Sequence, residues 1–189
     1  MELAAYEPRG AVGQGLGYAV ANRGGCHLNG GYLVVLEGLG LSVNPYTTHG
    51  KGVLCAMFQD LMEACSAGGN CLFTTYAFFP TFLMSKPNSI VTRVVNKVMT
   101  ELGLVIKLLL RVPTAIAMHM PFEMLPHTKA IYYATGMKMN FGKFLRIGER
   151  GYNLERLIDI KLGVSEKDDD LPERLKNELQ IATNPKSKV

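Results

Sequence analysis

A helical spacing of apolar residues begins just after Lys51 and ends at a pair of glycines. Because these apolar side chains recur at steps of three and four residues, they share one face of a helix. They are Val53, Leu54, Met57, Phe58, Leu61, Met62 and Cys65. The next residues, 67–70, read AGGN, and paired glycines favour the left-handed cap at which helices end. The sequence therefore predicts one long helix that stops at residues 67–70.

Three segments further along the chain also carry helical signals. Residues 89–110 open on a serine, a favourable N-cap, and place valines and a leucine on one side. Residues 142–162 mix apolar side chains with charges of both signs, which is typical of an amphipathic helix with ion pairs on its polar face. Residues 168–175, DDDLPERL, supply an aspartate N-cap and an early proline for a short helix. Period-two alternation is confined to residues 32–36, so we expect a mainly α protein.

The N-terminal part of the chain has a different composition. It is rich in glycine, asparagine, proline and threonine up to residue 50, which predicts a glycine-rich loop region with one short helix around residues 15–22. The whole chain has 189 residues, 48% of them hydrophobic, and this suits a globular protein with one core. The expected architecture is one irregular helical domain over residues 1–189.

Charge and hydropathy argue against nucleic-acid and membrane partners. The net charge of +4 comes from 20 basic and 16 acidic residues that are scattered along the chain, whereas nucleic-acid binding needs a clustered basic surface. The most apolar run, residues 102–118, contains Lys107, Arg111 and Pro113, and a membrane span rarely tolerates such charges. We expect buried helices there. The N-terminus carries Glu2 where a secretion signal would be basic.

The cysteines indicate neither zinc nor disulfides. Cys26, Cys55, Cys65 and Cys71 form no C-x-x-C pair and no compact framework. Reduced thiols in a cytoplasmic protein are the expectation that follows.

Several separated segments together resemble one family, the tungsten-containing aldehyde ferredoxin oxidoreductases, and specifically their C-terminal helical domain. The segments are ELAAYEPRG, GLGYAVANRGGCHL, CLF, YYATG, IGERGYNLERL and KDDDLPERL, and they span nearly the whole chain. The resemblance implies oxidation of small aldehydes to carboxylic acids at a tungsten or molybdenum bis-pterin centre. It also implies a neighbouring [4Fe-4S] cluster that passes the electrons to ferredoxin. A relative that acts on aromatic acyl thioesters would carry the same segments.

Two residues match chemically active positions of the family. Cys71 matches the cysteine that this domain contributes to the iron-sulfur cluster, although a lone cysteine is more often a small buried hydrophobe. His27 matches the histidine beside the metal centre, where an imidazole can bond the substrate oxygen and move its proton. The alternative for His27 is a capping or core histidine. If both assignments hold, the two residues lie at one wall of a shared cavity.

The residues around His27 are candidates for cofactor binding. Arg9 and Arg23 can bind anionic cofactor groups, because guanidinium pairs with phosphate through two hydrogen bonds. Equally, both arginines could tie loops to the C-termini of helices. Gly24 and Gly25 keep the backbone thin enough for a pterin or substrate to approach.

A second cofactor contact is expected just before Cys71, and here the sequence departs from the family. The family motif is D-x-x-G-L-C, but this chain reads SAGGNC, with Ser66 in place of the aspartate and Gly69 and Asn70 before the cysteine. A hydroxyl offers a hydrogen bond but not the two charged oxygens of a carboxylate. The remaining histidines, His49, His119 and His127, have no motif support and are interpreted as structural or surface residues.

The chain resembles a piece of a longer enzyme, truncated at both ends. Family members take three further cluster cysteines from a C-x-x-C-x-x-x-C stretch in the preceding domain, and the sequence contains no such stretch. The implied partners are therefore the N-terminal domains of the same enzyme, ferredoxin and a small aldehyde. We expect the isolated chain to be inactive without those domains. The alternative is a non-catalytic remnant, or a helical domain that binds partners.

Overall fold

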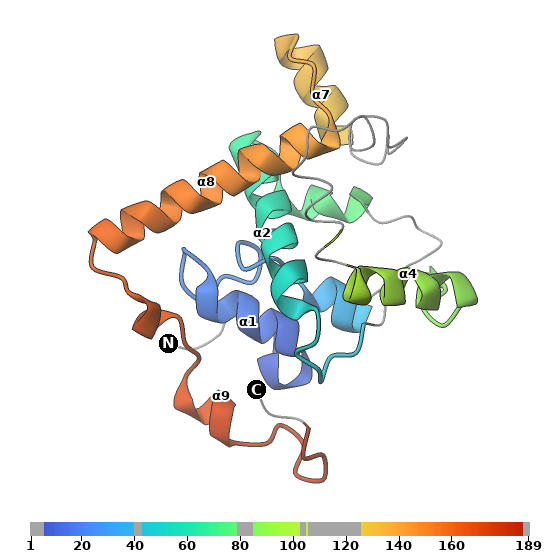
Figure 1. Ribbon diagram of the computed structural model, residues 1–189, viewed down its shortest axis with the longest axis vertical. Coiled ribbons are helices and arrows are strands. Elements are labelled where there is room, and N and C mark those ends of the chain that lie inside the picture. The colour runs from blue at the N-terminus through green and yellow to red at the C-terminus, as the bar shows by residue number, and fades with distance from the viewer. Residues whose placement is uncertain (1–5, 40–42, 79–84, 103–104, 106–125, 187–189) are drawn as a thin grey trace.

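The computed structural model describes residues 6–39, 43–78, 85–102, 105 and 126–186. These residues form helices and loops and contain no strand, which confirms the mainly α prediction (Figure 1). The elements are η1 (Pro8–Gly10), α1 (Val12–Val20), η2 (Val35–Leu39), α2 (Lys51–Ala67), η3 (Leu72–Phe78), α4 (Ile90–Glu101), α7 (Pro126–Thr135), α8 (Phe141–Lys161), η4 (Glu166–Asp168) and α9 (Glu173–Asn177).

Helix α2 is the central element, and it packs against α8 on one side and α1 on another (Figure 1). A Cβ atom at Gly148 of α8 would clash with the carbonyl oxygen of Asp60 in α2. A Cβ at Gly151 would press on the side chain of Glu63. Glycine inside a helix costs about 1 kcal/mol relative to alanine, but here it allows the two backbones to approach closely.

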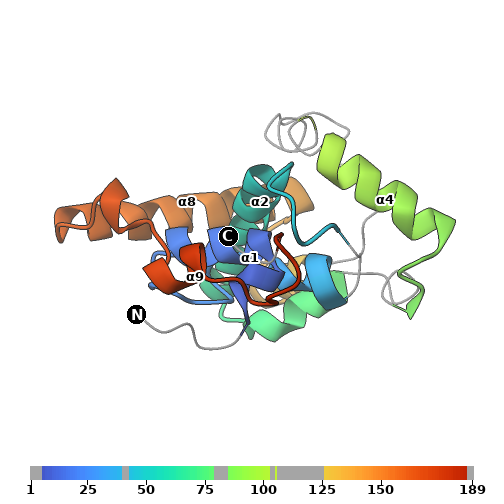
Figure 2. The same ribbon diagram turned by 90° about the horizontal axis from the view of Figure 1, so that it is seen from below.

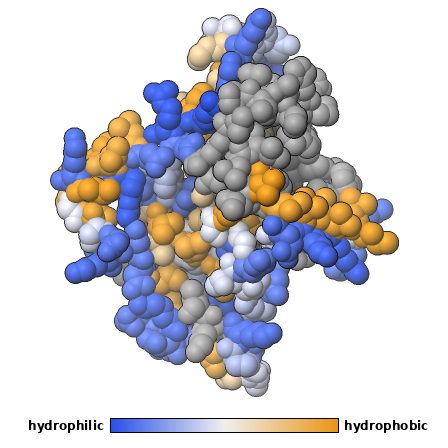
Figure 3. All heavy atoms as spheres, viewed as in Figure 1, coloured by the Kyte–Doolittle hydropathy of each residue, from blue (hydrophilic) through white to orange (hydrophobic). Residues whose placement is uncertain are grey.

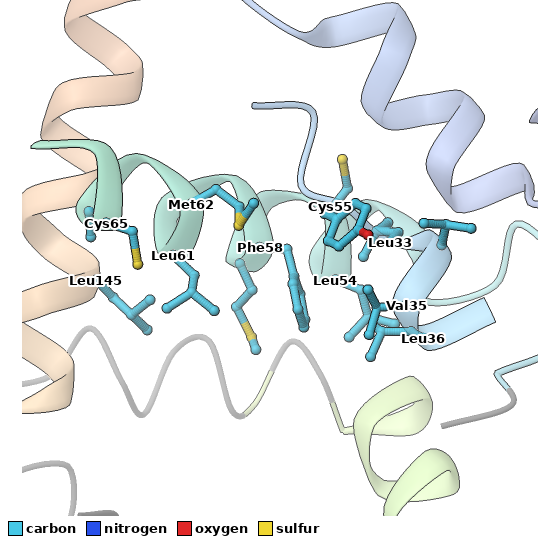
Figure 4. Close-up of a cluster of buried hydrophobic side chains, with 14 of the residues drawn as sticks. Leu33, Val35, Leu36, Leu54, Cys55, Phe58, Leu61, Met62, Cys65 and Leu145 are labelled. Carbon is cyan, nitrogen blue, oxygen red and sulfur yellow. The ribbon is translucent and has the colours of Figure 1, made fainter. Parts of the chain in front are cut away.

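The core lies along the apolar face of α2. Leu54, Phe58 and Leu61 are all less than 5% exposed, and they pack against Leu33 and Leu145 (Figure 4). The helical spacing of residues 53–65 therefore predicted the core face of α2 correctly. Burying side chains of this size stabilises the fold by about 1.5–3 kcal/mol each.

The end of α2 follows a Schellman geometry. Gly69 has φ 70°, the left-handed region that favours glycine. Its amide donates to the carbonyl of Ser66 at 2.9 Å, and the Asn70 amide donates to the carbonyl of Cys65 at 3.0 Å. The predicted stop at residues 67–70 is confirmed, because the two glycines supply the cap and the turn that follows.

The expected glycine-rich loop region at the N-terminus is not confirmed. Helix α1 takes up three of the glycines there, Gly13, Gly15 and Gly17, and lies at Val12–Val20 rather than around residues 15–22. The backbone of α1 crosses closely over the turn that follows residue 26: a Cβ at Gly17 would strike the Gly30 carbonyl, and one at Gly30 would strike the Gly17 carbonyl. These glycines permit packing as well as turns.

A buried ion pair joins α1, η2 and α2. The side chains of Glu37 and Lys51 are 1% and 2% exposed and bond each other directly. Glu37 also accepts hydrogen bonds from the amides of Gly13 (2.7 Å) and Gln14 (3.0 Å). The carboxylate thus caps the N-terminus of α1, where backbone N–H groups have no partner within the helix.

The other predicted helices are present with shifted ends. The segment 89–110 forms α4, whose N-cap Ser89 accepts a hydrogen bond from the Thr92 amide at 3.1 Å. Most of its C-terminal part, and most of the apolar run 102–118, lie outside the described residues. The segment 142–162 forms α8, as predicted.

The predicted aspartate N-cap of residues 168–175 was wrong. The N-cap residue of α9 is Pro172 and not an aspartate; Asp170 instead bonds Lys176 at 2.6 Å. The alternating residues 32–36 form no strand. They run into the π-helix η2, and all five are buried, so each of them packs against the core.

The C-terminal segment returns to the N-terminal one, where α9 lies beside η1 (Figure 2). No described helix combines the length and the apolar character needed to cross a membrane. Rows of apolar side chains nevertheless remain exposed on α4 and on the C-terminal half of α8 (Figure 3).

Candidate functional site

A row of aromatic rings joins the segment around His27 to the segment around Cys71. The His27 ring lies 5.5 Å from that of Tyr6 and 5.9 Å from that of Tyr32, measured between centroids. Tyr32 in turn lies 6.3 Å from Phe73, two residues beyond Cys71. The fold therefore brings these two sequence-predicted regions into one neighbourhood.

Buried Gln14 of α1 holds the backbone of His27. Its side-chain amide donates to the His27 carbonyl at 3.3 Å, and its side-chain oxygen accepts from the Val34 amide at 3.1 Å. The His27 ring is half-buried, and desolvation lowers its pKa. The neutral imidazole that this favours can accept a proton.

Cys71 is the exposed thiol of this chain. Cys55 and Cys65 are buried and Cys26 is half-buried, and burial raises the pKa of Cys65 to about 12. A thiolate is the form that binds metal, so Cys65 is poorly suited as a ligand. Cys71 immediately precedes η3, and its carbonyl accepts hydrogen bonds from the amide (2.9 Å) and hydroxyl (2.6 Å) of Thr74.

Arg9 is bound within the chain and ties a loop to a helix end. Its Nε and Nη2 donate to the two carboxylate oxygens of Glu7 at 2.8 and 2.9 Å. Its Nη1 donates to the carbonyl of Glu178, the C-cap residue of α9, at 3.2 Å. The Arg9 hydrogen bond lowers the pKa of Glu7. This geometry corresponds to the structural alternative for Arg9.

Arg23 and Ser66, both candidates for cofactor binding, contact each other. Arg23 Nη2 lies 3.3 Å from Ser66 Oγ, 3.2 Å from Glu155 and 3.5 Å from Glu63. Burial, followed by the nearby Glu155 carboxylate, raises the pKa of Glu63. Arg23 thus neutralises two glutamates where α2 and α8 meet.

Gly24 and Gly25 line a cavity of about 360 Å³ beside the C-terminal segment. Both have positive φ, 58° and 36°. The lining includes the carboxylates of residues 168–170 and Asp159 against the single cation Arg156, and neither His27 nor Cys71 belongs to it. An acidic lining disfavours an anionic cofactor. Because His27 is not among the lining residues, the two glycines also face a different space from the aromatic row.

The last two candidates for cofactor binding, Gly69 and Asn70, lie directly after the C-terminal end of α2. Gly69 provides the left-handed turn described above, and the Asn70 side chain donates to the Gly68 carbonyl at 3.2 Å. Both residues therefore act in ending α2. The turn that they form leads directly to Cys71.

Comparison with known proteins decides the family. The model described as "Aldehyde ferredoxin oxidoreductase, domains 2 & 3" matches residues 1–189. The chain belongs to the aldehyde ferredoxin oxidoreductase family. The resemblance found in the separated sequence segments is therefore confirmed.

Two curated relatives show how much of the family protein this chain represents. The tungsten-containing aldehyde ferredoxin oxidoreductase of Thermococcus kodakarensis is 31% identical over 182 residues, which cover 94% of this chain and 23% of the relative. The enzyme of that name from Pyrococcus horikoshii is 32% identical over 181 residues, covering 94% and 22%. The chain thus spans less than a quarter of the length of these relatives. No solved structure matches it.

The described residues do not form a complete metal centre by themselves. Among them, no group of three or more His, Cys, Asp or Glu side chains could hold a metal ion. A [4Fe-4S] cluster takes four cysteine thiolates, and this fold presents one exposed thiol, Cys71. The arginines expected to bind pterin, Arg9 and Arg23, are already paired with carboxylates. Cys71 could therefore serve as one ligand of such a cluster only if other thiolates, from outside the described residues, completed it.

Sequence reasoning missed the contacts of His127. This histidine of α7 is 4% exposed, and its Nε2 lies 2.6 Å from the hydroxyl of Thr74. The sequence, which offers no motif here, indicates only a structural or surface residue. Since 53 positions separate it from Thr74, no local pattern in the sequence indicates that the two residues meet.

Proposed function

We propose that this chain forms the C-terminal part of an enzyme that oxidises aldehydes to carboxylic acids and delivers the electrons to ferredoxin. Each turnover converts an aldehyde and water into an acid, two protons and two electrons. The observation that carries the proposal is the aromatic row from His27 to Phe73, because it links the segment of His27 to the segment that contains Cys71, whose thiol is exposed.

Each of these two residues has a role in the proposal. Cys71 supplies one thiolate to a [4Fe-4S] cluster, and a separate part of the enzyme supplies the other three. His27, held neutral by burial, hydrogen-bonds the substrate oxygen and accepts a proton. A tungsten bis-pterin, when bound, supplies the two-electron redox chemistry.

The remaining part of the enzyme is the proposed partner, and exposed apolar side chains on two helices support it. These side chains are between 41% and 79% exposed, comprising Val91, Val94, Val98 and Leu102 in and just after α4 and Leu154, Leu157, Ile158 and Leu162 in and just after α8 (Figure 3). Contiguous exposed apolar surface is typical of protein interfaces. We propose that the family sequence absent from this chain covers both rows.

Metal analysis after anaerobic expression tests the function. The chain is produced alone and together with the remaining length of the Thermococcus kodakarensis relative as a separate polypeptide. We expect no stoichiometric iron or tungsten on the lone chain and both metals in the complex. Cys71→Ser should abolish the iron of the cluster, whereas the matched variant Cys26→Ser should retain it.

Two outcomes contradict the proposal. A full cluster on the lone chain would show that the site is not shared. A stable complex without iron or tungsten would favour the non-catalytic, partner-binding alternative, which the internal pairing of Arg9 and Arg23 also favours.

A further inference from the structure

The turn that presents Cys71 is closed by a single residue, Thr74. Its amide and its hydroxyl both lie within hydrogen-bond distance of the Cys71 carbonyl, at 2.9 and 2.6 Å. The orientation of the Cys71 backbone, and hence the direction from which the thiol projects, depends on where the Thr74 hydroxyl is held.

The Thr74 hydroxyl is held by a buried imidazole. His127 Nε2 lies 2.6 Å from Thr74 Oγ1, and His127 is 4% exposed. The ring packs against Phe144 of α8, at a centroid distance of 6.0 Å and an interplanar angle of 31°. Because Phe144 is fully buried, the imidazole is anchored in the core rather than in a surface loop.

The number of available hydrogens decides which of His127, Thr74 and the Cys71 carbonyl donates to which. A hydroxyl carries one hydrogen, so if Thr74 donates to the Cys71 carbonyl, then His127 Nε2–H must donate to Thr74 Oγ1. This leaves Nδ1 with a lone pair, and Nδ1 is buried without a hydrogen-bond partner. The opposite tautomer would bury an unpaired N–H, which proteins tolerate less well than an unpaired acceptor.

We propose that His127 is a positioning residue for Cys71. Through the relay from Nε2–H to the Thr74 hydroxyl and on to the Cys71 carbonyl, it ties the exposed turn to the α7–α8 part of the core. Its importance for metal binding rests on the proposed function, in which Cys71 is a cluster ligand. The relay itself is a property of this chain without any metal.

The relay is tested by the rate at which iodoacetamide alkylates Cys71, followed by peptide mass spectrometry of the metal-free chain. His127→Phe and Thr74→Val each remove one member, and we expect each to change the rate about fivefold, the factor for one ordinary hydrogen bond. The double variant should change it no further. His127→Gln, whose amide nitrogen can replace Nε2–H, and Thr74→Ser should stay near the wild-type rate.

Independent effects of His127→Phe and Thr74→Val, unchanged rates, or failure of Gln and Ser to preserve the rate would overturn the relay. A merely structural role of the ring would make Phe a better replacement than Gln, which is the opposite of our expectation.

Nitrogen-15 NMR of the wild-type chain keeps the test independent of whether any variant folds. We expect the His127 imidazole in the Nε2–H tautomer, with Nδ1 unprotonated, and the Nδ1–H tautomer would overturn the relay. The metal content of the complex tests the proposed function separately, so either proposal can fail while the other stands.

Discussion

At the scale of single residues, buried charge has the largest consequence for stability. Lys51 and Glu37 are removed from water and satisfied by each other, by two amides of α1 and by the Asn44 carbonyl, which accepts from Lys51 at 2.8 Å. Removing one partner of such a pair leaves a charge that has neither water nor a counter-ion. The pair of Arg174 and Glu178 is different, because both side chains are at least 60% exposed. If one of them is removed, water still solvates the other charge.

Replacing Glu37 should therefore cost far more than replacing an exposed glutamate. We expect Glu37→Gln to lower the free energy of unfolding by about 3–5 kcal/mol, measured by urea denaturation. The matched change Glu178→Gln should stay within about 1 kcal/mol of wild type. Similar midpoints for the two variants would show that the buried pair does not hold α1 and α2 together.

At the scale of helices, the crossing of α2 and α8 explains glycines that a propensity argument counts as defects. Gly148 faces the Asp60 carbonyl without room for a Cβ, whereas Gly52 of α2 has no atom within 4 Å of its Cβ position. One residue type thus has opposite energetic roles in two packed helices.

Alanine substitutions separate these roles. Gly148→Ala should destabilise the fold by about 1–3 kcal/mol, because the added methyl group forces the two backbones apart. Gly52→Ala should instead stabilise it by about 0.5–1 kcal/mol through helix propensity. Thermal unfolding followed by circular dichroism measures both, and a gain in stability for Gly148→Ala would contradict the close crossing.

At the scale of the whole molecule, the apolar side chains fall into two groups. One group forms the core around α2, and the other stays exposed in rows on α4 and α8. The core that the described residues form lies around α2, and Arg9 connects the N-terminal segment to α9. The rows on α4 and α8 contribute little to that core, since Val94 and Leu157 are 56% and 57% exposed. We therefore attribute their apolar character to the proposed partner surface rather than to the fold.

Charges on these rows should therefore weaken assembly without weakening the fold. We expect Val94→Asp combined with Leu157→Asp to reduce co-purification with the remaining part of the relative's enzyme at least tenfold. The unfolding midpoint of the lone chain should change little, because exposed substitutions usually alter stability by less than about 0.5 kcal/mol. Arg93→Ala, an exposed change on α4, serves as the control. Undiminished assembly would exclude the two rows as the interface.

The sequence by itself determined the mainly helical class, the core face and end of α2, the capped start of α4 and the span of α8. Each of these depends on interactions within a few residues, such as helical periodicity or a cap, and such interactions are visible in a local pattern. Membership of the family was also recognisable from separated segments. The roles of His27 and Cys71 stay predictions that the proposed experiments test.

Only the tertiary structure decided which distant groups meet. The close packing of α1 depends on the crossing of Gly17 and Gly30, and the internal pairing of Arg23 depends on glutamates from α2 and α8. The contact between His127 and Thr74 has no local signature either. The physical reason is the same in each case: these side chains are held by packing partners far away in the chain, and a local pattern carries no information about which of them the fold will bring together.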